Sequence, residues 1–164
     1  MNAGLILPTE NPSIELRQLQ ASDADQVFEA IKSNRLSGNQ HLVATGVDGW
    51  FQTASKVEDA IRRSHNDKWQ MMGIFQAQDD TFIGSIDLGS REFGPEIGYW
   101  LDERYTGFGY ATIATRALSE FALQKYGHVV ARTADNNTPS QKVLLRAGFN
   151  KIDHTESKVL FEKK

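Results

Sequence analysis

The chain has 164 residues, no cysteine and a formal net charge of −3 at pH 7. This length suits one compact domain, and 40% hydrophobic residues are enough to build a core. The absence of cysteine excludes disulfides and cysteine metal sites. No cluster of lysine and arginine indicates a nucleic-acid surface, and no apolar run reaches the roughly 18 residues of a membrane helix. The four histidines show no ligand spacing, so we expect no metal: His41, His65, His128 and His154.

The first twelve residues lack a basic stretch followed by an apolar core, so they do not resemble a signal peptide. We therefore expect a cytoplasmic protein with no membrane partner. We read residues 1–12 as a short, partly ordered tail and residues 13–164 as a single domain. The sequence leaves the choice between a monomer and a homodimer open.

The first 68 residues predict one strand and two helices. A strand is expected near 14–19, where apolar and polar residues alternate. Capping-box patterns that start at Ser22 and Ser55 each predict the beginning of a helix. Between these helices, residues 36–52 contain three glycines and no clear period, which predicts a long loop.

Three strands follow with short connections, which predicts an antiparallel meander. They are expected at 69–76, at 82–88 and at 96–101, with turns at 78–81 and 89–95. Alternation in the second strand predicts two faces. One face carries Phe82, Gly84, Ile86 and Leu88, and the other carries Ile83, Ser85 and Asp87.

The last third of the chain predicts two helices and three strands. A helix is expected at 110–126, ended by Gly127, with its apolar stripe at Ile113, Ala114, Ala117, Leu118, Phe121 and Ala122. The next strand, 129–133, then lies parallel to 96–101 because a helix connects them. Thr138 is the expected cap of the last helix, which Gly148 ends, and residues 149–152 and 158–161 form a final hairpin.

The segment from 104 to 111 indicates an anion site, because a glycine-containing turn joins a strand to a helix start. A Walker loop is excluded, since Gly109 is followed by Tyr110 and Ala111 instead of Lys and Ser or Thr. A nicotinamide-binding fingerprint matches only in part, because Thr112 stands where the third glycine belongs. It remains an alternative interpretation.

Two motifs together resemble a known family. The first reads Arg104-x-x-Gly107-x-Gly109, and the second reads Asn137-x-x-Ser140 followed by Leu144-x-x-x-Gly148-Phe149. In this order they resemble the GNAT N-acetyltransferases, in particular the ribosomal-protein branch. The resemblance implies an α/β (α+β) fold with a mixed, mostly antiparallel sheet of about seven strands and about four helices. In that fold, strands 96–101 and 129–133 splay apart around acetyl-CoA.

The resemblance also implies which residues bind acetyl-CoA. The loop with Gly107, Gly109 and the amides of Phe108, Tyr110 and Ala111 would hold the pyrophosphate, and Arg104 would pair with a phosphate. Trp100 and Leu101 would offer backbone contacts to the pantetheine arm, although as side chains they suit the core. Asn137 would bind that arm or order its loop. Asn137 and Ser140 also suit an ordinary helix start.

The catalytic assignments follow the same resemblance. Many GNATs place a tyrosine as the acid where this chain has Leu144, so we expect Ser140, near the sulfur of CoA, to replace it. Glu96 is the first candidate for the base that takes the amine proton, and Asp87 is the second. Either could instead be a half-exposed strand carboxylate.

The expected function is acetyl-CoA-dependent transfer of an acetyl group to a primary amine. Without cysteine, the amine would attack the thioester directly in a ternary complex. The resemblance implies a protein N-terminus as acceptor, and polyamines, amino acids and aminoglycosides stay open. We expect selectivity in residues 36–52 and 89–95. The rival from another class is a non-catalytic acyl-CoA-binding module.

Overall fold

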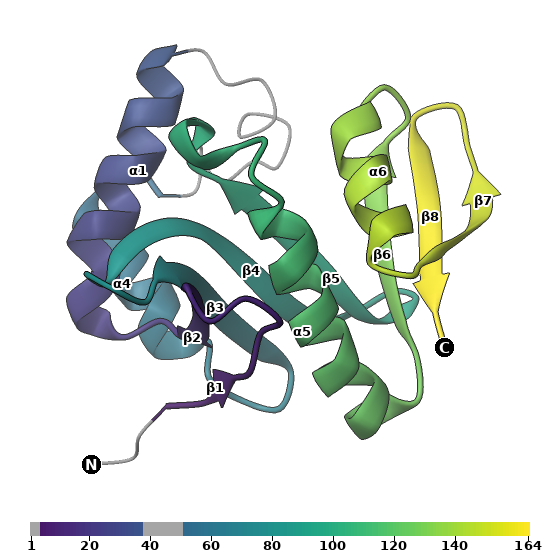
Figure 1. Ribbon diagram of the computed structural model, residues 1–164, viewed down its shortest axis with the longest axis horizontal. Helices are drawn as coiled ribbons and strands as arrows, with labels where there is room; N and C mark the ends of the chain where they lie inside the picture. Colours follow the sequence, from purple (N-terminus) through teal and green to yellow (C-terminus); the bar gives the residue numbers. More distant parts are fainter. Residues whose placement is uncertain (1–3, 38–50) are drawn as a thin grey trace.

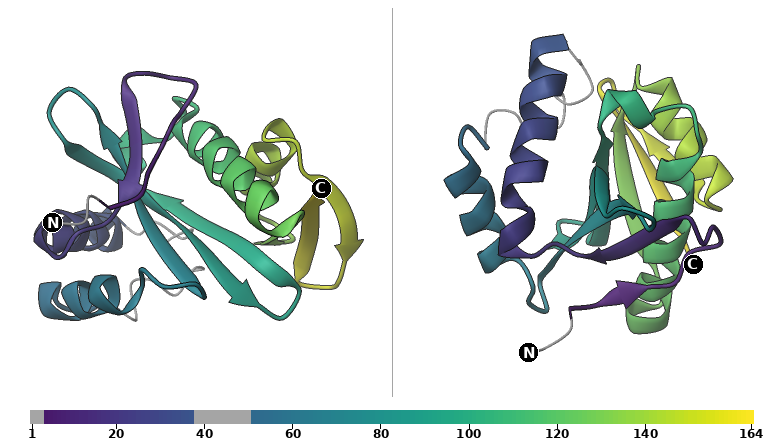
Figure 2. Two further views of the ribbon diagram at one scale, coloured as in Figure 1. Left: turned by 90° about the horizontal axis from the view of Figure 1, so that it is seen from below. Right: turned by 60° about the vertical axis from the view of Figure 1, so that its left-hand side comes forward.

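One eight-stranded sheet runs through the computed structural model, which describes residues 4–37 and 51–164 (Figure 1). Its order is β1-β2-β3-β4-β5-β6-β8-β7. Helices α1 and α4 cover one face, and α5 and α6 cover the other (Figure 2). The strands are β1 (Ile6–Leu7), β2 (Ile14–Gln18), β3 (Trp69–Gln76), β4 (Thr81–Arg91), β5 (Gly94–Leu101), β6 (Val129–Ala134), β7 (Asn150–His154) and β8 (Lys158–Lys163). The helices are α1 (Ala24–Ser37), α4 (Ala54–Arg63), α5 (Tyr110–Tyr126) and α6 (Thr138–Arg146), with 3-10 turns at Ala21–Asp23 and Glu103–Tyr105.

This architecture confirms the predicted mixed, mostly antiparallel sheet. The eighth strand is β1, which pairs antiparallel with β2 and lies in the segment that we read as a tail. Residues 6–7 therefore belong to the same sheet as the rest of the domain. Helix α1 continues to Ser37 and takes the first two residues of the predicted 36–52 loop. The part of that loop between 38 and 50 lies outside the described residues.

The sequence prediction places both of these helix caps two residues too late in the chain. The Asp23 carboxylate accepts the N–H of Gln20 at 2.7 Å, so the box begins at Gln20 and not at Ser22. Thr53, not Ser55, caps α4, and its hydroxyl accepts the N–H of Lys56 at 3.2 Å. Several Ser, Thr and Asp side chains stand near each helix start, and packing decides which one caps it.

A β-bulge corrects the predicted faces of β4. Phe75 pairs with Phe82 and Ile74 with Gly84, so Ile83 is an extra residue without a partner in β3. Phe82 therefore packs in the layer under α1 and α4, while Ile86 and Leu88 pack under α5. The predicted turn at 89–95 is also too long, because β4 reaches Arg91 and β5 begins at Gly94.

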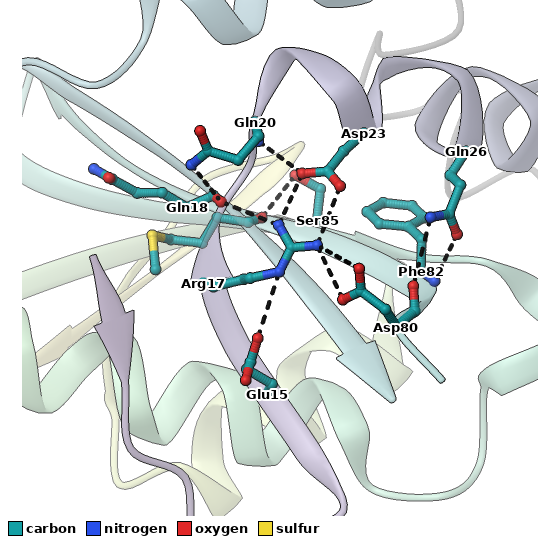
Figure 3. Close-up of polar contacts among 10 residues, drawn as sticks. Glu15, Arg17, Gln18, Gln20, Asp23, Gln26, Asp80, Phe82 and Ser85 are labelled. Atoms are coloured by element: carbon teal, nitrogen blue, oxygen red, sulfur yellow. Dashed lines mark hydrogen bonds and ion pairs between the residues drawn. The ribbon is translucent and has the colours of Figure 1, made fainter. Parts of the chain in front are cut away.

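Arg17 of β2 links the segment just before α1 to the sheet through ion pairs (Figure 3). Its guanidinium bonds to Asp23 at 2.8 Å and to Asp80 at 3.0 Å, and it lies 3.7 Å over the ring of Phe75. Asp23 stands just before α1, and Asp80 stands in the turn between β3 and β4. The network thus sets the position of the helix layer that covers one side of the site.

Strands β5 and β6 separate after a short parallel contact. Glu96 pairs with Val130 and Ile97 with Ala131. Further along, residues 98–101 of β5 pair with β4, and the described residues show no more pairs with β6. The predicted splay of these two strands is confirmed. It leaves backbone N–H and C=O groups of β5 free to meet a ligand.

Gly84→Ala is expected to lower the free energy of unfolding by roughly 1–3 kcal/mol, the usual cost of overpacking a core. A Cβ at Gly84 would lie 2.4 Å from the carbonyl oxygen of Trp100, and backbone cannot move aside cheaply. Gly89→Ala on the same strand is the control, because its nearest neighbour is the flexible Arg91 side chain at 3.2 Å. Urea denaturation measures both, and equal stabilities would contradict the packing argument.

Candidate active site

The loop before α5 contains two glycines in the left-handed conformation. Gly107 has φ +86° and Gly109, the N-cap of α5, has φ +82°. No atom lies within 4 Å of a Cβ built at either position, so conformation and not space requires glycine there. The first backbone N–H groups of α5, at Tyr110 and Ala111, have no partner inside the helix. Together with the helix dipole, they suit an anion.

Arg104 lies at the mouth of this loop and is held by Asp102. The buried Asp102 carboxylate accepts from Arg104 Nη2 at 2.6 Å and from its Nε at 3.0 Å. Hydrogen bonds to Asp102 raise the pKa of Arg104, so the guanidinium stays charged. Beside it, the exposed ring of Phe108 stacks on Tyr110 with centroids 5.6 Å apart. A charged, exposed arginine thus stands next to the free N–H groups.

A cavity of about 430 Å³ passes through the gap between β5 and β6. Residues from both faces of the sheet line it. Asn137, Ser140 and Tyr99 stand on the side of α6, and Asp87, Glu96 and Trp100 stand on the other side. The cavity thus brings together five of the predicted site residues: Asp87, Glu96, Trp100, Asn137 and Ser140. Leu101, Arg104 and the loop 107–111 are not among its lining residues.

Asn137 orders the start of α6. Its side chain accepts the N–H of Ser140 at 3.2 Å, which makes Asn137 the cap and corrects the prediction that Thr138 has this role. This hydrogen bond orders the start of α6, and a contact of Asn137 with the pantetheine arm stays a prediction. The cap fixes the first turn of α6 and therefore the position of the Ser140 hydroxyl at the cavity.

Tyr99 is a site residue that the sequence reading missed. Its hydroxyl lies 2.6 Å from Ser140 Oγ and donates to the Ser140 carbonyl at 3.1 Å, so it bridges β5 and α6 across the splay. Burial raises the pKa of Tyr99 to about 12. Leu144 is buried in the core and offers no proton donor. Alternation in β5 could have found Tyr99, since it shares the α5 and α6 face with Ile97 and Leu101.

Glu96 is buried, not half-exposed as one reading of the sequence allowed. Its Oε1 accepts from Arg132 Nε at 3.1 Å and lies 3.9 Å from Arg91 Nη1. Its Oε2 is also buried and has no hydrogen-bond partner among the residues that the structure describes. Such an oxygen is costly to leave unpaired, so it is suited to a donor on a ligand.

Asp87 lies across the strand pair from Gly98, close to Glu96. Its Oδ2 accepts from Trp69 Nε1 at 3.0 Å and from Arg91 Nη2 at 2.9 Å. Burial raises the pKa of Asp87, and the opposing effects of Arg91 and Trp69 are smaller. Its Oδ1 lies over Gly98, where a Cβ would come within 2.9 Å of it. A carboxyl with a raised pKa holds a proton more readily than an ordinary aspartate does.

A second unpartnered polar atom, the hydroxyl of Thr133, lies on the wall of the cavity opposite Glu96. Thr133 Oγ1 is buried and, within the described part of the chain, makes no hydrogen bond. Thr133 belongs to β6 and lines the same cavity as Tyr99 and Ser140. The sequence alone offered no signal for it, because a threonine in a strand is ordinary.

The described residues contain neither a metal cluster nor a membrane-spanning helix. Across residues 4–37 and 51–164, no three His, Asp or Glu side chains come together as metal ligands. In the same ranges no helix has the length and apolar character needed to cross a bilayer.

The cavity between two splayed strands and the glycine turn at the start of α5 together fit the class of coenzyme A-dependent acyltransferases that the sequence motifs predicted. The chain belongs to the GNAT acetyltransferase family, whose domain description matches residues 13–150. The resemblance seen in the sequence is thereby confirmed. The protein is an N-acetyltransferase that uses acetyl-CoA as its co-substrate.

Proteins and structures that are similar to this chain are also named as acetyltransferases. A Bacillus subtilis protein named "Probable N-acetyltransferase YjcK" is 29% identical over 147 residues, covering 85% of this chain and 81% of that protein. The structure of a ribosomal-protein-S5-alanine acetyltransferase from Vibrio fischeri has a TM-score of 0.77 at 19% identity, covering 95% and 96% of the two chains. RimL, a ribosomal L7/L12 α-N-protein acetyltransferase solved with coenzyme A, has a TM-score of 0.76 at 16% identity, covering 97% of each chain.

Gly109→Ala is expected to weaken acetyl-CoA binding about tenfold, because an alanine strained at this φ displaces the loop amides. Gly127→Ala is the matched control. Gly127 ends α5 with φ +77° and also has nothing within 4 Å of a built Cβ, so both variants carry the same strain. Calorimetric titration measures affinity, and thermal unfolding measures stability. Equal losses of affinity in the two variants would contradict the role of the loop.

Proposed function

We propose that the acceptor is the α-amine of a protein or peptide N-terminus and that transfer takes place in the cavity between β5 and β6. The observation that carries the proposal is the chemistry of the two cavity walls. A carboxylate pair, Asp87 and Glu96, stands on one side, and a hydroxyl pair, Tyr99 and Ser140, stands on the other. Acetyl transfer from a thioester to an amine needs a base for the amine and an acid for the leaving thiolate.

Acetyl-CoA would be bound by two parts of the chain. The loop 107–111 and Arg104 would take the pyrophosphate at the start of α5. The pantetheine arm would follow the backbone of Trp100 and Leu101, where β5 is no longer paired with β6. Thr133 Oγ1, which has no partner among the described residues, would donate to or accept from an amide of that arm.

The reaction would proceed by direct attack within a ternary complex. The amine loses a proton to the carboxylate side, a C–N bond forms, and the carbonyl oxygen becomes an oxyanion near strand N–H groups around Leu101. The C–S bond then breaks. The thiolate, with a free-thiol pKa of about 8.5, takes a proton from the linked hydroxyls of Tyr99 and Ser140.

Asp87 is the stronger candidate for the base, which reverses the order expected from the sequence. Burial raises the pKa of Asp87, so it accepts a proton more readily. Glu96 is instead held by Arg132 and Arg91, and its unpartnered Oε2 would orient the ammonium by accepting a hydrogen bond. In this arrangement Glu96 positions the amine and Asp87 takes its proton.

The choice of a protein N-terminus is supported by two structural neighbours: RimL is named as an α-N-protein acetyltransferase of ribosomal L7/L12, and the Vibrio fischeri protein as a ribosomal-protein-S5-alanine acetyltransferase. Free amino acids and other small amines form the second candidate class. A cytoplasmic location and a monomeric or homodimeric state remain predictions from the sequence.

Initial rates of thiol release, measured over a matrix of acetyl-CoA and peptide concentrations, test this proposal. The control peptide has the same sequence with a blocked N-terminus. We expect release only with the free α-amine and intersecting double-reciprocal lines, which indicate a ternary complex. Thiol release that does not depend on the peptide, or parallel lines, would contradict direct transfer.

A further inference from the structure

We infer that this acceptor site selects a single amine attached to an apolar group and rejects polycationic amines. The inference rests on the proposed function, because it names the chemistry of the acceptor in the same cavity. The substrates of this acceptor site would be peptides whose first residue has an apolar side chain. Polyamines, aminoglycosides and peptides that begin with lysine would be excluded.

The cavity wall under α1 and α4 is apolar. It receives side chains from the segment before α1, from α1 and α4, from the segment before α4 and from two strands. These residues are Leu19, Val27, Phe51, Val57, Met71 and Trp100. Because this wall is next to Asp87 and Glu96, an amine that reaches the carboxylates must place its substituent against it. An apolar substituent gains from that burial.

Both carboxylates of the cavity are already paired with arginines, and the cations outnumber them. Among the described lining residues, the carboxylates are Asp87 and Glu96, and the cations are Arg91, Arg132 and Lys158. Asp87 is paired with Arg91 at 2.9 Å, and Glu96 is paired with Arg132 at 3.1 Å. A second ammonium on the acceptor would therefore meet guanidinium groups or apolar side chains. Burying an unpaired charge in such a place is strongly unfavourable.

The hydrogen-bond capacity left at the carboxylates suits one ammonium group. Within the described part of the chain, Glu96 Oε2 is buried without a hydrogen-bond partner, and the hydrogen bonds from Trp69 and Arg91 to Asp87 both go to Oδ2, which leaves Oδ1 for a donor. The two oxygens belong to neighbouring strands, since Asp87 pairs with Gly98 and Gly89 with Glu96. These residues are diagonal neighbours across the strand pair, and we expect one acceptor ammonium to donate to both.

The test compares peptides that differ only in their first residue, which is Leu, Gly or Lys, together with spermidine. The unaltered protein is expected to have kcat/KM at least about tenfold higher for the Leu peptide than for the Gly peptide, as an apolar pocket provides. It is expected to show no transfer above background with spermidine and a rate on the Lys peptide below that on the Gly peptide. Thiol release gives the rates, and mass spectrometry confirms the acetylated α-amine.

Phe51→Ala should lower kcat/KM for the Leu peptide about tenfold more than for the Gly peptide and so abolish the preference for Leu over Gly. Phe28→Ala is the matched control, because Phe28 packs in the same hydrophobic layer but does not line the cavity. It should keep the preference. Turnover of spermidine or the Lys peptide at the level of the Leu peptide would overturn this inference alone. The absence of transfer to every acceptor, with acetyl-CoA still bound, would overturn the proposed function as well.

Discussion

The Asp87→Asn variant is expected to lose about a hundredfold or more in kcat, the usual range for a general base. Its affinity for acetyl-CoA should not change, because Asp87 lies on the far side of the gap from α6. The pKa of Asp87 is raised above its ordinary value of 3.8, so kcat/KM of the unaltered protein should fall as the pH drops through that raised pKa. The variant should lose this acidic limb. Steady-state rates across the pH range measure both effects.

Two further variants control this prediction. Asp67→Asn also removes an ion-paired aspartate, but one that lies 3.8 Å from Lys125 Nζ and outside the cavity, so it should keep full activity. Glu96→Gln should raise KM for the amine more than it lowers kcat, since Glu96 positions the ammonium. If Glu96→Gln instead removes the acidic limb and Asp87→Asn keeps it, then Glu96 is the base.

The melting temperature of Asp87→Asn distinguishes a chemical role of Asp87 from a structural one. A raised pKa means that the folded state favours the protonated form, so this group's stabilisation is present at low pH and is lost as the pH rises through the raised pKa. Above that raised pKa, the ionised carboxylate therefore lowers the free energy of unfolding. Asp87→Asn should unfold at the same temperature as the unaltered protein or a higher one. A lower melting temperature would contradict this.

Tyr99→Phe and Ser140→Ala are each expected to lower kcat by about 10- to 100-fold, and the double variant should be little worse than either one. The two hydroxyls lie 2.6 Å apart and would deliver a single proton to the thiolate, so removing either breaks the same path. The loss is smaller than for the base because a thiolate is a tolerable leaving group.

Tyr126→Phe is the matched control for this pair. Tyr126 lies at the end of α5, and its hydroxyl donates to the Asp67 carbonyl at 3.4 Å, outside the cavity. It should retain the full rate. Losses that multiply in the double variant would show that Tyr99 and Ser140 act independently, and a full rate in Tyr99→Phe would leave Ser140 as the only acid.

The sequence predicted the bounds of those elements whose ends are set by neighbouring residues in the chain. Helix α5 spans the predicted 110–126 because a glycine turn begins it and Gly127, with φ +77°, ends it. Strand β3 likewise matches the predicted 69–76, since a turn bounds its end and both its faces are covered. In both cases the residues that define the boundary stand next to it in the chain.

Features that depend on pairing at a distance could not be predicted. The bulge at Ile83 arises from the register between β3 and β4, and alternation along one strand cannot reveal it. The two-residue β1 is too short to show a period. The contact between Tyr99 and Ser140 joins residues 41 positions apart, and the burial of Glu96 depends on Arg132 in the next strand. Motif spacing pointed to Ser140 and Glu96, but it gave no sign of their hydrogen-bond partners, Tyr99 and Arg132.

Calorimetric titration of the purified protein with acetyl-CoA, with NAD as the second ligand, tests the central claim most directly. The claim is that the splayed gap and the glycine loop form an acetyl-CoA site. We expect one acetyl-CoA per chain with micromolar affinity and no heat of binding with NAD. Absence of acetyl-CoA binding, or binding of NAD in its place, would contradict the account of the loop on which the proposed mechanism depends.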